Sequence, residues 1–246
     1  LMRIAGLDLE VRALGAPPAA AHARVDAAAW TEAARRVHEK GWRLVSLWGS
    51  DDRDRDGTFG LFASYAMDSG LVVLELRVPE RKPTYPELGG LFPAAAFMQR
   101  AVFDLLGVAA EDAPDTRPWL RHGAWRDGEF PLRRDFTRSE AANAFAPYPF
   151  VRVEGDGVHE IPVGPIHAGI IEPGHFRFSV VGEKVLRLEP RLGYTHKGIE
   201  KRFEAFHVAD GHKLAGRISG DSTVAYAWAY AQAAEALSGA AVPERA

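Results

Sequence analysis

No cysteine occurs among the 246 residues of this chain. It therefore has no disulfide to hold a small fold together, and it cannot bind an iron–sulfur cluster or any other metal through thiolate ligands. A fold without such links depends on a hydrophobic core, and the chain is long enough for one large domain or two smaller ones. Apolar residues make up 47% and charged residues 26%, the balance typical of a folded globular protein.

Charge and hydropathy exclude two classes of interaction. The net charge is −3 and the pI is about 6.3, so bulk electrostatics give no attraction to nucleic acid. No apolar run approaches the ~20 residues of a membrane-spanning helix, so we expect no direct membrane span. The chain begins at Leu1 and ends just after an alanine-rich run, so we expect it to be part of a longer protein.

Hydrophobic periodicity predicts an α+β domain over residues 1–108. An amphipathic, alanine-rich stretch predicts a helix over 26–40, which Gly41 ends. Alternating apolar residues predict three strands, and an apolar run with helical spacing follows them. These strands are 42–49, 58–67 and 71–78, and the second helix is 93–106. The charged run 50–57 predicts a solvated turn between the first two strands. Together these elements predict a unit made of a helix, a three-stranded meander and a second helix.

The second half of the sequence has a different pattern. Residues 109–158 are rich in proline and charge, which predicts an extended linker that wraps over another surface. Residues 159–246 predict an antiparallel hairpin sheet followed by the first helices of a larger helical domain. The expected strands are 161–171, 177–181 and 184–189, and the helices start at Tyr194 and at Ser222, the latter running to Leu237.

Common metal and nucleotide motifs are absent. The nearest histidines, His196, His207 and His212, have spacings that do not align ligands on one helix face, so we interpret them as separate structural or surface residues. The sequence has no HExxH, no GxxxxGK[ST] or GxGxxG, and no GxSxG. The chain alone is therefore not expected to bind NAD. Ser219 and Ser222 lie near a predicted helix start, where serine commonly caps the helix.

The second predicted helix and the linker share a more informative pattern. Its residues are Arg100, Asp104 and Gly107 on the helix and Trp125, Pro131, Leu132, Arg133 and Asp135 in the linker. This pattern resembles the signature of the 30-kDa subunit of NADH:quinone oxidoreductase, respiratory complex I, which reads E-R-x-x-x-D-x-x-G and, after a tryptophan-containing loop, H-P-L-R-K-D-Y. The residues that depart from it are Gln99, Phe130 and Phe136. A simpler interpretation of Arg100 and Asp104 is an ion pair on one helix turn.

A second pattern covers the hairpin region and the helix after it. The strings GPIH (164–167), EPGHFR (172–177) and RLGYTHKGIEK (191–201) resemble the start of the 49-kDa subunit of complex I. They are even more similar to the large subunit of group 4 nickel–iron hydrogenases of the formate hydrogenlyase subunit 5 and hydrogenase-4 component G type. Those proteins fuse a 30-kDa-like domain to the large subunit in this order. The two resemblances together cover roughly residues 30–246.

The resemblance also shows where this sequence departs from a hydrogenase. Active relatives have R-x-C-G-x-C-x-x-x-H at this helix start, with both thiolates on the metals. Here Arg217 is kept, Ser219 and Ser222 replace the cysteines, and Tyr226 replaces the histidine. A serine hydroxyl is a hard donor and does not substitute for a bridging thiolate, so we expect no nickel.

The resemblance implies a subunit of a membrane-bound respiratory oxidoreductase. An iron–sulfur cluster in a small partner subunit would pass electrons to a quinone-like or unknown acceptor, coupled to ion movement in membrane-arm subunits, with this chain peripheral on the cytoplasmic side of the inner membrane. His167 or His175 would contact a quinone, and Arg217 would line the cavity, although Gly220 stands where the family's quinone-binding tyrosine is expected.

Glu200 matches a glutamate that relays protons in hydrogenases, or it is an exposed neighbour of Glu204. Two alternatives to the oxidoreductase interpretation stay open. One is a non-catalytic scaffold that docks neighbouring subunits, and the other is a conventional nickel–iron hydrogenase large subunit.

Overall fold

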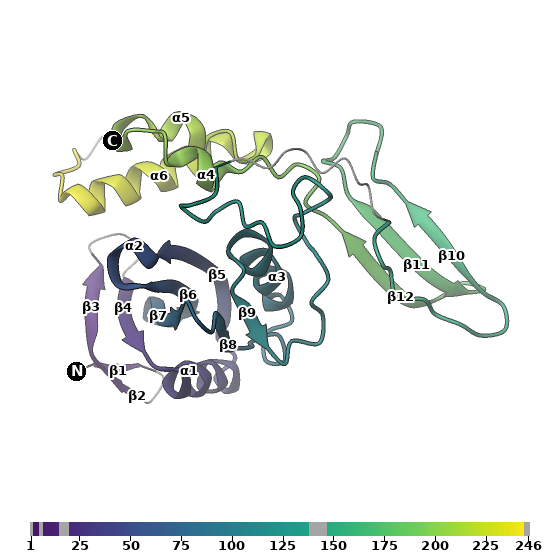
Figure 1. Cartoon of the computed structure of the whole chain (residues 1–246), viewed down its shortest axis with the longest axis horizontal. Coiled ribbons are helices and arrows are strands. Elements are labelled where there is room, and N and C mark those ends of the chain that lie inside the picture. Colours follow the sequence, from purple (N-terminus) through teal and green to yellow (C-terminus); the bar gives the residue numbers. More distant parts are fainter. Residues whose placement is uncertain (1, 5–6, 15–19, 138–146, 244–246) are drawn as a thin grey trace.

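Two separate sheets organise the chain (Figure 1). The computed structural model describes residues 2–4, 7–14, 20–137 and 147–243. The larger sheet has the strand order β3-β4-β7-β6-β5, in which β4 and β7 run parallel and the other neighbours antiparallel. Its strands are β3 Val11–Leu14, β4 Ala20–Val25, β5 Arg43–Asp52, β6 Thr58–Met67 and β7 Gly70–Pro79. Two short pairs accompany it, β1 Met2–Ile4 with β2 Leu7–Leu9 and β8 Thr84–Pro86 with β9 Ala109–Glu111.

The α+β class and the β5–β6–β7 meander confirm the prediction, but the sheet is wider than predicted. Strands β3 and β4 extend it beyond β7, and β4 was missed because alanine, a poor strand former, occupies half of its positions. The predicted turn over 50–57 is also wrong in part. Strand β5 continues to Asp52, and the one-turn helix α2 Arg53–Asp56 follows and ends at Gly57, whose φ of +72° suits glycine.

Two helices cover one face of the larger sheet. Helix α1 Ala27–Glu39 begins where the Asp26 carboxylate accepts a 2.8 Å hydrogen bond from the amide of Ala29. Helix α3 Ala95–Leu106 lies over β5, and its approach is so close that a Cβ on Gly49 would meet the Leu106 side chain at 2.6 Å. Glycine at position 49 is therefore what allows α3 to pack there.

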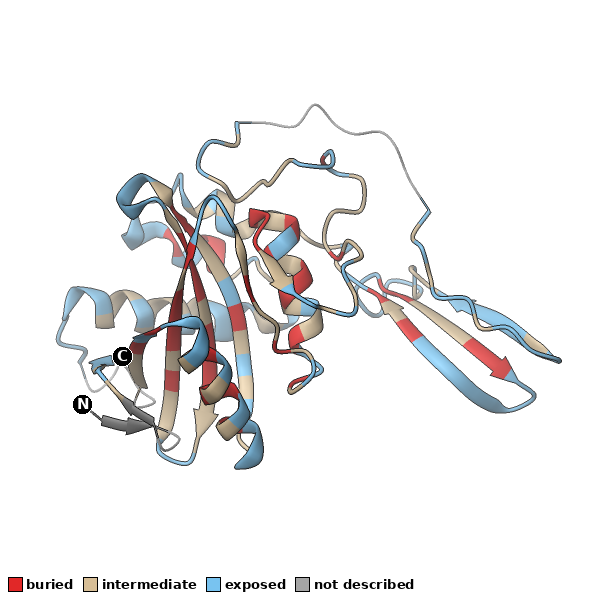
Figure 2. Ribbon diagram, turned by 60° about the horizontal axis from the view of Figure 1, so that its bottom comes forward, coloured by how far each residue is buried: buried red, intermediate tan, exposed pale blue. Residues whose placement is uncertain are grey.

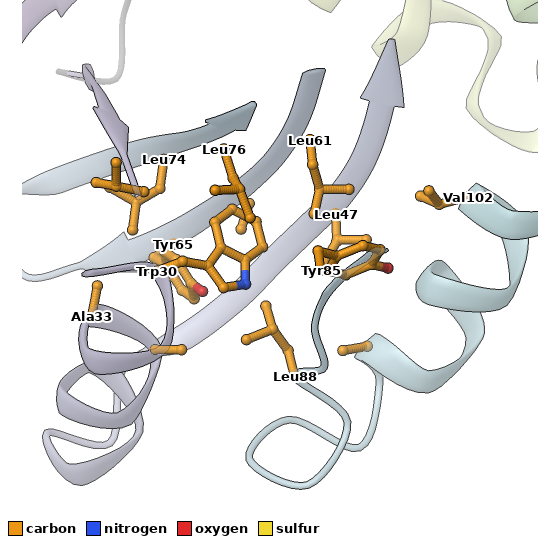
Figure 3. Packing of buried hydrophobic residues seen from close by; sticks show 14 of the residues in the cluster. Trp30, Ala33, Leu47, Leu61, Tyr65, Leu74, Leu76, Tyr85, Leu88 and Val102 are labelled. Atoms are coloured by element: carbon orange, nitrogen blue, oxygen red, sulfur yellow. The ribbon is translucent and has the colours of Figure 1, made fainter. Parts of the chain in front are cut away.

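A hydrophobic core lies between this sheet and the two helices (Figure 3). The Trp30 side chain is fully buried, contacts the Tyr85 ring edge-on at 6.4 Å and donates to the carbonyl of Pro86. Tyr65, Leu61 and Leu74 approach it from the sheet. Burying each large apolar side chain contributes about 1.5–3 kcal/mol, so this cluster is the main source of stability in the chain.

The second sheet projects away from the first (Figure 2). Its strands are β10 Val158–Val163, β11 His175–Val181 and β12 Lys184–Arg191, all antiparallel. A turn at Gly182 and Glu183 joins β11 to β12, between the two predicted strands. The strand predicted over 161–171 ends at Val163 instead, because Gly164, with φ of +79°, and Pro165 start a loop that lasts to residue 174.

Short helices follow the second sheet. They are α4 Ile199–Phe203, the 3-10 turn η1 Val208–Asp210, α5 His212–Ala215, the 3-10 turn η2 Gly220–Ser222 and α6 Thr223–Ser238. The long helix α6 confirms the prediction, but the helix expected from Tyr194 starts only after Gly198. No residue of α6 is buried, and 66% of the Trp228 side chain is exposed. No helix in the described part of the molecule is long and apolar enough to cross a membrane.

Candidate functional site

The arginine of the R-x-x-x-D pattern binds the linker rather than its own helix. Arg100 is buried in α3, and its guanidinium donates to the carbonyls of Arg117 at 2.6 Å and Pro118 at 3.1 Å. It forms an ion pair with Asp115 at 3.0 Å and donates to the Tyr148 hydroxyl at 2.5 Å. The simpler interpretation, an ion pair between Arg100 and Asp104, is therefore wrong as an account of this arginine.

Asp104 binds the same segment. One of its carboxylate oxygens accepts hydrogen bonds from the amides of Trp119 and Leu120, both at 2.6 Å. A buried carboxylate with two amide donors is well compensated, and its loss would leave two buried N–H groups without a partner. Arg100 and Asp104 thus fix residues 115–120 against α3.

The glycine and the P-L-R-x-D string of the pattern meet at the end of α3. Gly107 ends the helix with φ of +72°, and a Cβ there would lie 2.6 Å from the side chains of Phe130 and Arg133. Arg133 stacks on the Phe130 ring at 4.3 Å and donates to the carbonyl of Leu106 at 2.7 Å. Only glycine suits both the backbone and the space.

Asp51, at the end of β5, anchors the next part of that string. Its carboxylate accepts from the amide of Arg134 at 2.9 Å and pairs with Arg53 at 2.8 Å. Arg53 in turn pairs with Asp135. Burial alone would raise the pKa of Asp51, but hydrogen bonds from Arg53 and from the Arg134 amide outweigh it and lower the pKa to about 2.

A group of charged residues joins the linker to β12. Glu189 at the end of β12 pairs with Arg117, and Arg191 donates to the carbonyls of Pro118 at 2.7 Å and Trp119 at 2.6 Å. We call this group, with the residues already described, the arginine cluster: Arg100, Asp115, Arg117, Tyr148, Glu189 and Arg191. Burial lowers the pKa of Arg191, which has no carboxylate in ion-pair contact among the described residues. The predicted linker is therefore ordered structure here, while its residues 138–146 lie outside the described part.

The two candidate histidines close the loop 164–174. His167 Nε2 donates to the carbonyl of Gly174 at 2.7 Å, and His175 Nδ1 donates to the carbonyl of Gly164 at 3.2 Å. His175 Nε2 accepts from Arg177 at 3.4 Å, which assigns the His175 tautomer from its partners. His167 Nδ1 has no hydrogen-bond partner among the described residues. The exposed residues of the loop include Ile166 and Ile170, at 80% and 85% exposure.

His175 and Glu200 line different cavities. His175 lies on the wall of a cleft of about 1680 Å³ between the hairpin sheet and the linker, together with Arg177, Arg191 and Tyr148. Glu200 is exposed and borders a smaller hollow of about 590 Å³ with Asp51, Asp52 and Glu204. The structure therefore does not bring these two candidate residues into one described cavity.

The segment around the replaced cysteines is held by backbone contacts. Arg217 is exposed, and its carbonyl and that of Ile218 accept from the Lys197 ammonium at 2.9 and 3.1 Å. The Thr223 hydroxyl donates to the carbonyls of Ser219 and Gly220. Ser219 and Ser222 occupy the N-cap positions of η2 and α6, as predicted, but neither side chain makes a capping hydrogen bond. No group of three or more metal-binding side chains occurs within the described residues.

Comparison with known proteins is consistent with these motifs. Residues 23–142 match the family described as "Respiratory-chain NADH dehydrogenase, 30 Kd subunit". Formate hydrogenlyase subunit 5 of Escherichia coli K12 is 33% identical over 84% of this chain and 38% of its own length. Hydrogenase-4 component G of the same organism is 31% identical over the same shares. The fused C/D protein of NADH-quinone oxidoreductase from Bacteroides fragilis is 28% identical over 70% of this chain and 37% of its own length.

This protein is a homologue of the group 4 hydrogenase large subunits and of the fused C/D proteins of complex I. It spans about 38% of the length of the curated relatives it matches first. The resemblance seen in the sequence is thus confirmed, and the oxidoreductase family with it. The boundaries at 108 and 158 and the roles of the site residues stay predictions.

A nickel–iron centre does not fit this homologue of the hydrogenase subunits. Ser219 and Ser222 offer hydroxyls where thiolates are needed, and the sequence has no cysteine elsewhere. Sequence reasoning also missed Lys197, Tyr148 and Glu189. Lys197 lies in the H-K-G-x-E string, and its spacing from Glu200 is the signal that could have identified it. No motif in the sequence marks Tyr148.

Proposed function

We propose that this subunit accepts electrons from an iron–sulfur cluster in a small partner subunit and passes them to a quinone-like acceptor rather than to a nickel–iron centre. The observation behind this proposal is the loss of the motif's metal-binding side chains: Ser219, Ser222 and Tyr226 replace them, while Arg217 and Gly220 are kept. Lys197 holds the backbone of that motif, so the segment keeps a defined conformation without its metal ligands. A segment that keeps its backbone conformation and lacks the metal ligands can contribute to the binding of a different ligand.

Of the two histidines, His167 suits the role of acceptor contact better. Both ring nitrogens of His175 are engaged, by the carbonyl of Gly164 and by Arg177. His167 keeps Nδ1 without a described partner on a half-buried ring. Reduction of a quinone to a quinol takes up two electrons and two protons, and an imidazole nitrogen in this position can transfer one of the protons.

Glu200 and Arg217 complete the proposed set. Both are exposed in this part of the molecule, so both are available to a partner subunit or to a further segment of the protein. We assign Glu200 to proton relay, because it borders a hollow that Asp51, Asp52 and Glu204 also line. Arg217 lies two residues before Ser219, where its guanidinium provides positive charge beside the acceptor.

The exposed apolar surface supports a place within a larger assembly. Helix α6 exposes Val224, Trp228 and Leu237, and the loop 164–174 exposes three isoleucines, Ile166, Ile170 and Ile171. Large exposed apolar side chains in such number are typical of interaction surfaces. We place the subunit in a membrane-bound complex with membrane-arm subunits, peripheral and on the cytoplasmic side of the inner membrane, where electron transfer is coupled to ion translocation.

The test is metal analysis and turnover of the purified full-length complex. We expect iron from the partner's clusters, no stoichiometric nickel and no hydrogen uptake or evolution. Reduction of decylubiquinone is expected to fall more than about tenfold in His167→Ala and Glu200→Gln, since a positioned acid or base contributes at least that factor. Glu154→Gln, on an exposed ion pair with Arg152, is the matched control.

Two outcomes would contradict the proposal. Tightly bound nickel would restore the conventional hydrogenase interpretation. Unchanged activity of the assembled complex in both His167→Ala and Glu200→Gln would favour the scaffold that only docks neighbouring subunits.

A further inference from the structure

The contacts of Tyr148 and Phe150 connect helix α3 to the histidine loop 164–174. The Tyr148 hydroxyl accepts from Arg100 of α3 at 2.5 Å, and the guanidinium groups of Arg191 and Arg117 lie over its ring at 4.3 and 5.2 Å. Aromatic faces attract cations, and two guanidinium groups on one ring hold it in place from both strand and linker.

Phe150 continues the contact toward the loop. Its ring meets Tyr148 edge-on at 4.8 Å and His175 at 5.1 Å, and the Arg177 guanidinium stacks on it at 4.4 Å. Arg177 also donates to His175 Nε2. Phe150 therefore contacts both the histidine and the group that fixes the tautomer of that histidine.

Hydrogen bonds hold the backbone on either side of Phe150. The carbonyl of Pro149 accepts from Arg117 at 2.9 Å, and the amide of Val151 donates to the Glu189 carboxylate at 3.1 Å. In the sheet register His175 stands directly opposite Arg191, the residue that stacks on Tyr148. The two routes from the arginine cluster, through the rings and through the strand pair, thus meet at His175.

His175 in turn holds the base of the loop. Its bond to the carbonyl of Gly164 joins the two ends of the loop, and the amide of Gly174 donates to the carbonyl of Pro165 at 3.0 Å beside it. His167 closes on the carbonyl of Gly174. A shift of His175 would therefore move the anchor to which His167 is bonded.

We propose that Tyr148 and Phe150 form an aromatic bridge that positions the histidine loop 164–174 from helix α3. They are positioning residues: neither is assigned contact with the acceptor. The effect on turnover rests on the proposed function of His167, whereas the effect on the loop does not.

Hydrogen–deuterium exchange of the full-length complex tests the bridge directly. Tyr148→Ala and Phe150→Ala are expected to speed exchange of the amides in 164–174 about tenfold, because local opening follows the loss of packed aromatic contacts. Phe150→Tyr keeps the ring and should restore the exchange rate to within about twofold, and Tyr148→Phe, which loses only the bond from Arg100, should lie between. Phe62→Ala, which breaks the stack with Trp48 at 5.3 Å on the larger sheet, is the matched control and should not change the loop.

Steady-state kinetics with decylubiquinone supply a readout that a purely structural role would not change. The bridge variants should raise KM about fivefold and lower kcat severalfold, since His167, the proposed acceptor contact and proton donor, is displaced. Faster loop exchange with an unchanged KM supports the bridge and contradicts the assignment of the loop to the acceptor.

Loop exchange that stays at the native rate in Phe150→Ala overturns the bridge. If Phe150→Ala instead speeds amide exchange throughout the protein, including α1, the exchange experiment is repeated with Phe150→Leu, which keeps apolar volume without the ring. Loop-specific exchange in Phe150→Leu supports the bridge, and uniform or native-like exchange overturns it.

Discussion

The two sheets of this protein differ in what surrounds them. The five-stranded sheet has a helical layer packed on it, and Trp30, Leu61 and Ala63 on that side are fully buried. The hairpin sheet β10–β12 has no such layer within the described residues, and five of the eight residues of β12 are exposed in succession. The first region has a core of its own, whereas the second is held to the rest of the chain by contacts such as those of the arginine cluster.

The largest expected effect lies in that core. Trp30→Ala should lower the free energy of unfolding by about 3–5 kcal/mol, as expected for removing a large buried aromatic side chain. Trp228→Ala in α6 removes the same side chain from an exposed position and should cost less than about 0.5 kcal/mol. Thermal and urea unfolding of the purified protein would measure both. Equal losses would contradict the distinction between the two regions.

The sequence indicated the covered region better than the uncovered one. Helix α1 and strand β7 follow from periodicity, because each buries residues at the spacing of its element, and strand β6 follows from its run of apolar residues, which is buried on both faces. The loop 164–174 and the short helices after it do not, because their conformation follows from glycines and from bonds such as His167 to Gly174. Helix α6 was predictable from its length and its alanine content, although none of its residues is buried here.

The candidate site was predictable only where a motif marked it. The strings around Arg100, Arg133 and Glu200 led to the right family. Their physical role was not visible in one sequence, because Arg100 binds residues 15 to 48 positions away. A local pattern can suggest an ion pair on one helix turn, but it cannot show that the real partners are carbonyls of a distant linker.

The junction between the two regions should tolerate substitution less well than an exposed loop. Gly107→Ala is expected to destabilise the protein by about 1–3 kcal/mol, because alanine is strained at positive φ and its Cβ would displace Phe130 and Arg133. Gly128 has φ of +81° with nothing near its Cβ position, so Gly128→Ala measures the backbone strain alone. The difference between the urea unfolding midpoints of Gly107→Ala and Gly128→Ala measures how much the packing of Phe130 and Arg133 against Gly107 contributes to stability. A Gly107→Ala variant no less stable than Gly128→Ala would show that the string 130–135 does not pack tightly on α3.

The smallest expected effect is the pH dependence of the same junction. The pKa of Asp51 is lowered to about 2 in the folded protein, because Arg53 and the Arg134 amide stabilise its ionised carboxylate. The sign follows from linkage: this contribution is fully present above the unfolded pKa of about 3.9 and is lost as pH falls toward 2. Asp51→Asn should therefore flatten the stability profile between roughly pH 4 and 2, measured by urea unfolding, relative to Asp68→Asn in the exposed β6–β7 turn. An unchanged slope in Asp51→Asn would mean that other carboxylates, and not this anchor, determine the acid sensitivity of the junction.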